Sequence, residues 1–252
     1  ANSVGADVIG FKAANNAVNP VSALNGSQKA VMLLNIEPDM DWAGSEAAKQ
    51  ALVQAQTVIA LTPFQSESLR ELADVMLPVT PSTETSGSFV SMEGRLQSFH
   101  GVVKPYAQSR PMWKVLRVIG NELDLDGFDY TSSEEVLARA CINSDSIVGK
   151  LNNQVQNVAS TGLQAASGLV RVGGVGIYQT DSVVRRSAPL QATVHAAIPA
   201  ASVHPKTLAA LQLTDAAQVV VKSGAASVLV TVVADESVAE NVVSLPLHPQ
   251  NK

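Results

Sequence analysis

Continuous apolar runs alternate with helical spacings along the first third of the chain. Residues 29–36 and 57–62 are apolar runs that end in a turn or a proline, and residues 74–78 form a shorter one. The first run is typical of a strand buried on both faces of a parallel sheet, the second is a further buried-strand candidate, and the third is strand-like. Residues 45–56 and 66–73 carry apolar side chains at helical spacing. This order predicts an α/β layer that needs further sheet to complete it.

The pattern changes after this layer. Residues 88–91 and 95–99 predict two short strands joined through Gly94, which suits the positive-φ position of a hairpin turn. Residues 111–123 then predict a helix that begins at a proline. A further short helix is expected to be capped by Thr131 or Ser132.

The rest of the chain divides into a connector and a β-rich end. Residues 142–180 are rich in Asn, Gln, Ser and Gly, which is typical of an irregular connector. Residues 181–252 hold Val-rich runs and one short helix, and residues 190–198 alternate partly as a strand would. We therefore predict an α/β region over 1–141, the connector over 142–180 and a small β-barrel domain over 181–252.

Composition narrows the possible functions. Hydrophobic residues make up 46% of the chain but aromatic ones only 4%, so the core must rely on small and β-branched side chains. The single cysteine, Cys141, excludes an internal disulfide and a Cys-ligated zinc or iron–sulfur site within this chain. A net charge of -5 argues against nonspecific binding to nucleic acid. No apolar run approaches the roughly 18 residues of a membrane span.

The start of the sequence is unusual. The chain opens with Ala1-Asn2-Ser3 in place of Met and has no basic-then-apolar leader. We expect it to be a piece of a longer protein.

Few polar residues outside the predicted hairpin point to a chemistry. Cys141 is expected to be a structural thiol. Arg185 and Arg186 could hold a phosphate or an acidic partner, or could be a solvated pair, and the sequence leaves both readings open. The four histidines lack the helical spacing of a metal pair and are expected on the surface or in loops: His100, His195, His204 and His248. We predict no catalytic residue and no metal site.

The hairpin segment is the most informative stretch. Glycine amides, Arg95 for an anion and Gln97 for amide hydrogen bonds could line a polar ligand pocket. An ordinary hairpin carrying a Glu93–Arg95 ion pair explains the same residues equally well.

This segment also carries a resemblance. Residues 74–78 (DVMLP) and 84–97 (ETSGSFVSMEGRLQ) resemble the signature of the molybdopterin oxidoreductase superfamily. Residues 102–117 and 177–191 resemble one branch, the large iron–sulfur subunit in the peripheral arm of bacterial NADH:quinone oxidoreductase, respiratory complex I. Residues 204–247 resemble the superfamily's dinucleotide-binding barrel.

The resemblance implies a molybdopterin-oxidoreductase-like α/β layer followed by that barrel. Ser88 stands for the usual Thr, and Ser91-Met92 stands for Asn-Thr, which fits the branch that keeps the fold without molybdenum. The residues that match the pterin-side motif then form a vestigial pocket or a structural hairpin: Gly87, Glu93, Gly94, Arg95 and Gln97.

The implied function is that of a structural and docking fragment without its own redox centre or cofactor. The parent would pass electrons from NADH toward quinone through iron–sulfur clusters held in its N-terminal part. Its partners would be other peripheral-arm subunits, on the cytoplasmic side of the bacterial inner membrane. The alternative is the C-terminal half of an active molybdopterin enzyme such as a formate dehydrogenase, with molybdopterin bound. A stand-alone small-molecule binding module is a third hypothesis.

Overall fold

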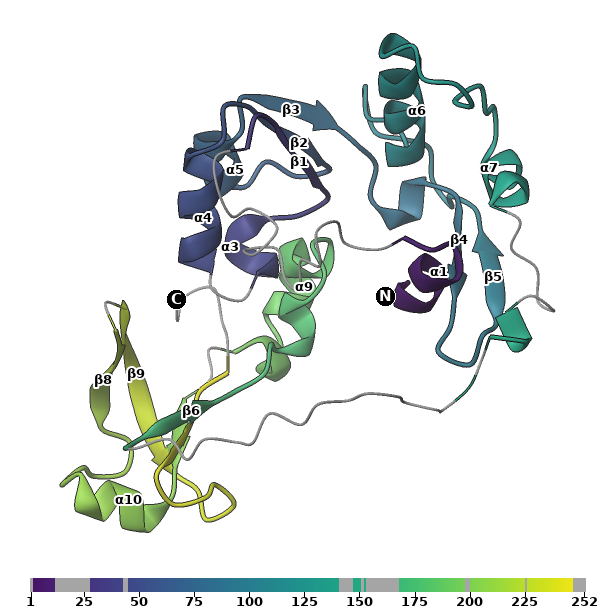
Figure 1. Cartoon of the computed structure of the whole chain (residues 1–252). Helices are drawn as coiled ribbons and strands as arrows, with labels where there is room; N and C mark the ends of the chain where they lie inside the picture. The colour runs from purple at the N-terminus through teal and green to yellow at the C-terminus, as the bar shows by residue number, and fades with distance from the viewer. Residues whose placement is uncertain are drawn as a thin grey trace. The chain divides into compact units, whose positions relative to one another are not determined.

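The computed structural model describes residues 2–11, 28–42, 45–140, 147–150, 152, 168–197, 200–224 and 226–246. These residues belong to two compact units, Ala1–Asn157 and Val158–Lys252 (Figure 1). The boundary between the units lies within the predicted connector. Cys141 and His248 lie outside the described residues, as do most residues of the connector before position 168.

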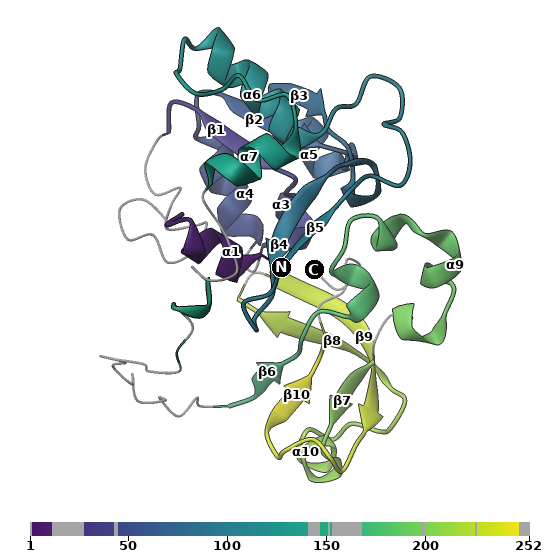
Figure 2. The same cartoon turned by 90° about the vertical axis from the view of Figure 1, so that its right-hand side faces the viewer.

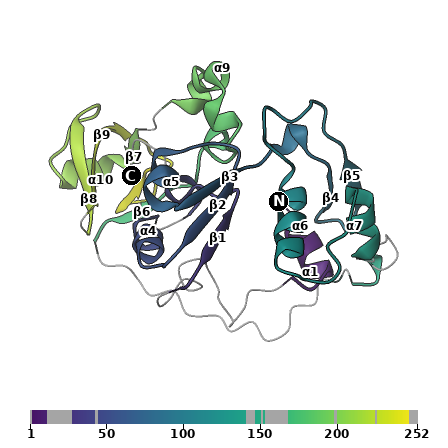
Figure 3. The ribbon, with the colours of Figure 1, turned by 90° about the horizontal axis from the view of Figure 1, so that it is seen from above.

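A parallel three-stranded sheet forms the first part of the unit Ala1–Asn157. The strands are β1 (Val31–Leu34), β2 (Val58–Thr62) and β3 (Val75–Pro78), in the order β1-β2-β3. Helices α4 (Ser45–Val53) and α5 (Glu67–Leu72) lie beside one face of this sheet (Figure 3), and a short α3 (Pro38–Asp41) precedes them. Their shared core holds Leu33, Leu52, Val58, Ala60 and Leu69.

Burial differs between the strands. β2 is central and four of its five residues are buried. In β1, Met32 and Leu34 are 39% and 40% exposed, and Val75 of β3 is 44% exposed. The prediction that the run at residues 29–36 is buried on both faces is therefore wrong for β1. The strand-like run at residues 74–78 forms β3 as expected, and β3 is also partly exposed. Within the described residues, both are edge strands and helices cover the other face only.

The second part of this unit is built around a hairpin. Strands β4 (Gly87–Val90) and β5 (Leu96–Phe99) pair antiparallel, and Gly94 has the expected positive φ of 78°. A 3₁₀ turn η2 (Ser82–Glu84) precedes the hairpin, and α6 (Met112–Glu122) and α7 (Ser133–Arg139) follow it. The predicted cap of α7 is confirmed, because the Glu135 amide donates to Ser132 Oγ at 3.2 Å.

The first helix of the chain covers the free edge of the hairpin. Helix α1 (Ser3–Val8) lies against β4 (Figure 1). The Val90 amide donates to Asn2 Oδ1 at 2.9 Å, and Asn2 Nδ2 donates to the Ser88 carbonyl at 3.5 Å. The Asn2 side chain thus pairs with two backbone groups that β5 does not use.

The second unit is a small β-rich domain. Its five strands have the order β6-β10-β7-β9-β8 and form a curled half-barrel sheet (Figure 2). Helix α10 (Pro205–Ala210) follows β7, and the core contains Ala201, Val203, Leu208 and Leu245. The strands are β6 (Val170–Val172), β7 (Ala201–Val203), β8 (Gln218–Ser223), β9 (Ala226–Ala234) and β10 (Val242–Ser244). The predicted fold class, an incomplete parallel α/β layer followed by a small barrel-like domain, is confirmed.

Strand β6 belongs to this sheet although its residues fall within the predicted connector. It pairs with β10, and the Arg171 guanidinium donates to the Leu245 carbonyl from Nε at 3.2 Å and from Nη2 at 3.0 Å. The chain crosses itself closely at Gly173, where a Cβ would lie 2.2 Å from the Leu245 carbonyl oxygen. Glycine is therefore required at this crossing.

The expected strand character of residues 190–198 is wrong for residues 190–197, and Ile198 lies outside the described residues. The chain forms helical turns here: η3 (Ile177–Gln179), η4 (Val184–Arg186), α9 (Ala188–Gln191) and η5 (Val194–Ala196). A proline stands in the first turn of α9, and Gln191 Nε2 donates to the carbonyls of Tyr178 and Val184 at 3.1 and 3.0 Å. These hydrogen bonds hold the turns together and outweigh the partial alternation.

Candidate functional site

The predicted motif residues Glu93, Gly94 and Arg95 form the turn of the β4–β5 hairpin. The Gly94 amide donates to the Ser91 carbonyl at 2.9 Å, and the Ser91 amide donates to the Arg95 carbonyl at 3.0 Å. The Arg95 amide also donates to Ser91 Oγ at 3.2 Å. The positive φ of the turn therefore accounts for glycine at position 94, and the hydrogen bond to the Oγ atom accounts for a polar residue at position 91.

The side chains of this turn face solvent. Arg95 Nη2 lies 3.8 Å from Glu93 Oε2, and these side chains are 71% and 81% exposed. Exposed ion pairs of this kind contribute about 0–1 kcal/mol. Gln97 is also exposed, and it lies opposite Phe89 in the strand register.

The remaining motif residue, Gly87, lies elsewhere. It lines a pocket of about 310 Å³ between α1, β4 and α7, whose walls are mainly apolar. A Cβ at Gly87 would lie 3.2 Å from the Phe99 ring. The structure therefore does not bring the five predicted residues together: the other four line neither this pocket nor the larger cleft described next.

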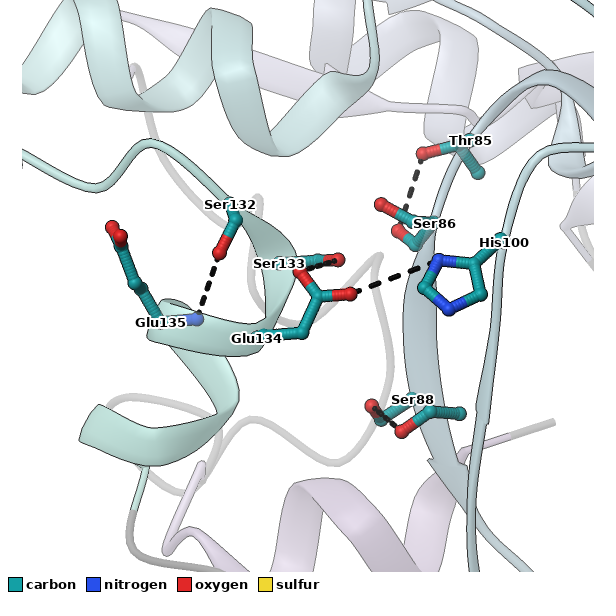
Figure 4. A network of polar contacts seen from close by, with 9 residues as sticks. Thr85, Ser86, Ser88, His100, Ser132, Ser133, Glu134 and Glu135 are labelled. Carbon is teal, nitrogen blue, oxygen red and sulfur yellow. Dashed lines mark hydrogen bonds and ion pairs between the residues drawn. The ribbon is translucent and has the colours of Figure 1, made fainter.

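A cleft of about 760 Å³ lies beside the hairpin. Three segments that are distant in sequence form it: residues 84–86, the β5–α6 loop with the first turn of α6, and the start of α7. Figure 4 shows Glu134 of α7 and His100, which follows β5, facing each other across it. His100 Nδ1 lies 3.7 Å from Glu134 Oε1, and the Ser133 hydroxyl donates to Glu134 Oε2 at 3.2 Å.

The acidic residues at the start of α7 are held by hydrogen bonds. The pKa of Glu134 is lowered, first by its own backbone N–H and then by the hydroxyls of Ser132 and Ser133 and by His100. The pKa of Glu135 is lowered mainly by the Thr131 backbone N–H, which donates at 2.7 Å, and next by the Thr131 hydroxyl, which donates at 2.8 Å. Both carboxylates are thus engaged within their own chain.

We expect Glu135 to titrate below the ordinary value of a glutamate. A lowered pKa in the folded state means that its stabilising contribution is present above the unfolded-state pKa and is lost as pH falls through the folded one. NMR titration of the side-chain carboxyl carbon measures this directly. Thr131→Val removes the hydroxyl donor and should raise the pKa of Glu135 while leaving that of Glu134 nearly unchanged. A native Glu135 that titrates at or above the ordinary value would contradict the hydrogen bonds described.

Cations dominate the other wall of the cleft. Lys104, Arg110 and Lys114 line it, and Lys114 Nζ lies 5.2 Å from the centroid of the Trp113 ring. The residue pattern assigns no role to these three cations, because it does not show that they line a cleft with residues 84–86 and the start of α7. The resemblance of residues 102–117 was the one signal that pointed to this stretch.

Other candidate residues have structural roles. Arg185 Nη1 donates to the Gln179 carbonyl at 3.1 Å and Arg186 Nη1 to the Ser182 carbonyl at 3.0 Å, so both support their own segment. His204 Nδ1 accepts from the Lys206 amide at 3.1 Å. Among the described residues, no group of three or more His, Cys, Asp or Glu side chains could hold a metal ion. In that part of the chain no helix is long and apolar enough to span a membrane.

Relatives in sequence match parts of the chain. Putative formate dehydrogenases of Staphylococcus aureus, strains bovine RF122 / ET3-1 and MRSA252, are 38% identical over 65 residues, which is 26% of this chain and 6% of theirs. The alpha subunit of the NADPH-Fe(3+) oxidoreductase of Geobacter sulfurreducens is 31% identical over 98 residues, 39% of this chain and 12% of that one. The aligned region thus spans 6% to 12% of the length of these curated relatives.

One solved structure and two family models match larger parts of the chain. Acetylene hydratase from Pelobacter acetylenicus has the same fold, with a TM-score of 0.61 at 16% identity over 89% of this chain and 38% of its own. Residues 1–122 match the model described as molybdopterin oxidoreductase. Residues 169–251 match the model described as molydopterin dinucleotide binding domain. Two parts of the chain thus match domain models of the molybdopterin oxidoreductase superfamily.

Proposed function

We propose that this chain is the C-terminal, structural and docking part of the large iron–sulfur subunit of a bacterial NADH:quinone oxidoreductase. The parent passes electrons from NADH toward quinone through iron–sulfur clusters bound outside this chain. It belongs to the peripheral arm on the cytoplasmic side of the inner membrane. The family-level relationship and the oxidoreductase relatives support an electron-transferring parent.

The arrangement of the hairpin residues carries the proposal. The superfamily implies a molybdopterin cofactor, which is large, polar and anionic and needs converging hydrogen-bond donors. Here Arg95 pairs with Glu93 in solvent, and Gly87 lines a mainly apolar pocket. On the hairpin face, the Ser88 and Ser98 hydroxyls bond each other at 2.8 Å. These residues do not fit a pterin cradle, and this misfit supports a subunit that keeps the fold without the cofactor.

A second candidate has its own support. Residues 169–251 match a dinucleotide binding domain, and putative formate dehydrogenases are among the relatives. These matches favour the C-terminal part of an active molybdopterin oxidoreductase with molybdopterin bound. In that case, residues outside the hairpin would hold the cofactor.

Metal and pterin analysis of the purified full-length protein separates the two candidates. We expect iron in amounts that account for iron–sulfur clusters, with molybdenum and pterin far below one per chain. Molybdenum at one per chain would overturn the first candidate and establish the second.

Replacing Arg95 gives an independent test. We expect Arg95→Ala to leave electron transfer by the assembled parent within about twofold of the native rate, because its ion pair with Glu93 is exposed and worth about 0–1 kcal/mol. Steady-state NADH oxidation by the purified complex measures this. A tenfold loss of turnover in a fully assembled complex would show that Arg95 acts at a cofactor or substrate.

A further inference from the structure

The β5–α6 loop is held rigidly at its beginning. The Val102 and Val103 amides both donate to the Thr83 carbonyl, at 2.9 and 3.3 Å. The Tyr106 amide donates to Glu84 Oε2 at 2.9 Å. These bonds tie the loop to the turn η2 that precedes the hairpin.

The end of the loop is fixed as well. Arg110 forms a parallel bridge with Val79, and the Thr80 amide donates to the Arg110 carbonyl at 3.1 Å. Within the loop, the Ser109 hydroxyl donates to the Tyr106 carbonyl at 2.6 Å. A loop fixed in this way loses little conformational entropy when it binds a partner.

Despite this order, the loop exposes its apolar side chains. Val102 is 82% exposed, Val103 57% and Tyr106 83%. Here a fixed backbone holds neighbouring apolar side chains in water. A partner that covers them lowers the free energy, because it removes apolar surface from water. Tyrosine and arginine are also the residue types that most often anchor protein interfaces.

The charge beside these side chains is positive. Lys104, Arg110 and Lys114 line the cleft next to the loop. Among the described residues, neither Lys104 nor Lys114 lies within 4.0 Å of an acidic group. The two acids of the cleft already have partners, since Glu84 accepts from the loop and Glu134 faces His100. Lys104, Arg110 and Lys114 thus line one cleft of a chain whose net charge is -5.

We propose that this loop and cleft form a docking surface for an acidic segment of another protein subunit. The docking surface comprises Val102, Val103, Lys104, Tyr106, Arg110 and Lys114. Carboxylates of the segment pair with the three cations, and its apolar side chains cover the two valines and Tyr106. Charge complementarity selects this partner, because opposite charges guide the encounter and disfavour other surfaces. The inference deepens the proposed docking function by naming the surface and the chemistry of the partner.

Photo-crosslinking from Tyr106 tests the proposal. The full-length subunit carries p-benzoylphenylalanine at position 106, is expressed in its own host, and is illuminated within the purified complex. Mass spectrometry should then identify a crosslink to an Asp/Glu-rich segment of a different subunit. A control with the probe at Val53, which is 72% exposed on α4 of the same unit, should not label that segment. Crosslinks to lipid, to a second copy of this chain, to a segment without acidic residues, or to nothing would each overturn the proposal.

Charge reversal supplies the second arm. Lys104→Glu with Lys114→Glu should lower the yield of this crosslink at least tenfold, whereas Lys29→Glu, at an exposed cation that precedes β1 in the same unit, should change it less than twofold. Raising the salt concentration should also lower the crosslink yield of the chain with native lysines. Because this chain carries no charge-reversing substitution, misfolding of a variant cannot explain that loss. A yield that ignores both charge and salt would contradict the role of the cations. Molybdenum in the protein would refute the proposed function but would not change the crosslinking result. The proposed function and the docking surface can therefore fail separately.

Discussion

Replacing Gly173 with alanine should destabilise the second unit by about 3 kcal/mol while leaving the first unit intact. The added Cβ would lie 2.2 Å from the Leu245 carbonyl oxygen and 2.6 Å from its carbon. Backbone atoms cannot rotate away as a side chain can, so β6 and the segment after β10 must separate. That movement breaks the two hydrogen bonds from the Arg171 guanidinium to the Leu245 carbonyl. It also pulls the Leu245 side chain, which is 2% exposed, out of the core.

The neighbouring Gly174 provides a matched control. Apart from its two neighbours in the chain, no residue lies within 4 Å of a Cβ at this position, so Gly174→Ala should change the stability by less than about 1 kcal/mol. Hydrogen exchange of the β6 and β10 amides measures the loss in the second unit. Both tryptophans, Trp42 and Trp113, lie in the first unit, so their fluorescence should stay native. Equal protection of β10 in the two variants would show that the crossing is not tight.

Leu52→Ala should destabilise the first unit by about 2–5 kcal/mol. Leu52 is 1% exposed and packs with Leu33, Val58 and Leu69 between α4 and the sheet. Removing its side chain loses buried apolar surface and leaves a cavity in the shared core of this layer. Trp42 packs against the same cluster, so denaturant unfolding followed by tryptophan fluorescence reports the change.

A substitution at the adjacent residue separates the effect of burial on stability from the effect of helix propensity. Val53 is the next residue of α4 and is 72% exposed. Val53→Ala should shift the free energy of unfolding by no more than about 0.5 kcal/mol, in either direction. Similar losses from the two substitutions would mean that the α4 face is not the one that the structure buries.

Local signals made much of the fold predictable. The run that became β2, the serine that caps α7 and the glycine of the hairpin turn each act over a few residues, and each is found as expected. Exposure of Met32 and Leu34 could not be predicted, because it depends on which face of the sheet receives helices. The turns around Gln191 could not be predicted either, since their hydrogen bonds join residues that the alternation pattern treats separately.

The candidate site could be predicted from the sequence less well than the fold. The hairpin motif was recognisable as a string of residues, but its side chains point to solvent or to one another. The cleft is made where residues near Glu84, Lys104 and Glu134 converge, and no spacing in the sequence predicts such a meeting. Only the three-dimensional arrangement shows that the loop backbone is fixed while its apolar side chains remain in water.

The position of Asn2 bears on how this protein avoids self-association. A two-stranded hairpin offers unpaired backbone groups along its outer strand, and such a strand can recruit another chain into an intermolecular sheet. The Asn2 amide occupies the groups of Ser88 and Val90 that an incoming strand would use. Within the described residues, no third strand pairs with the outer edge of β4. The Asn2 side chain therefore opposes intermolecular strand pairing at this edge.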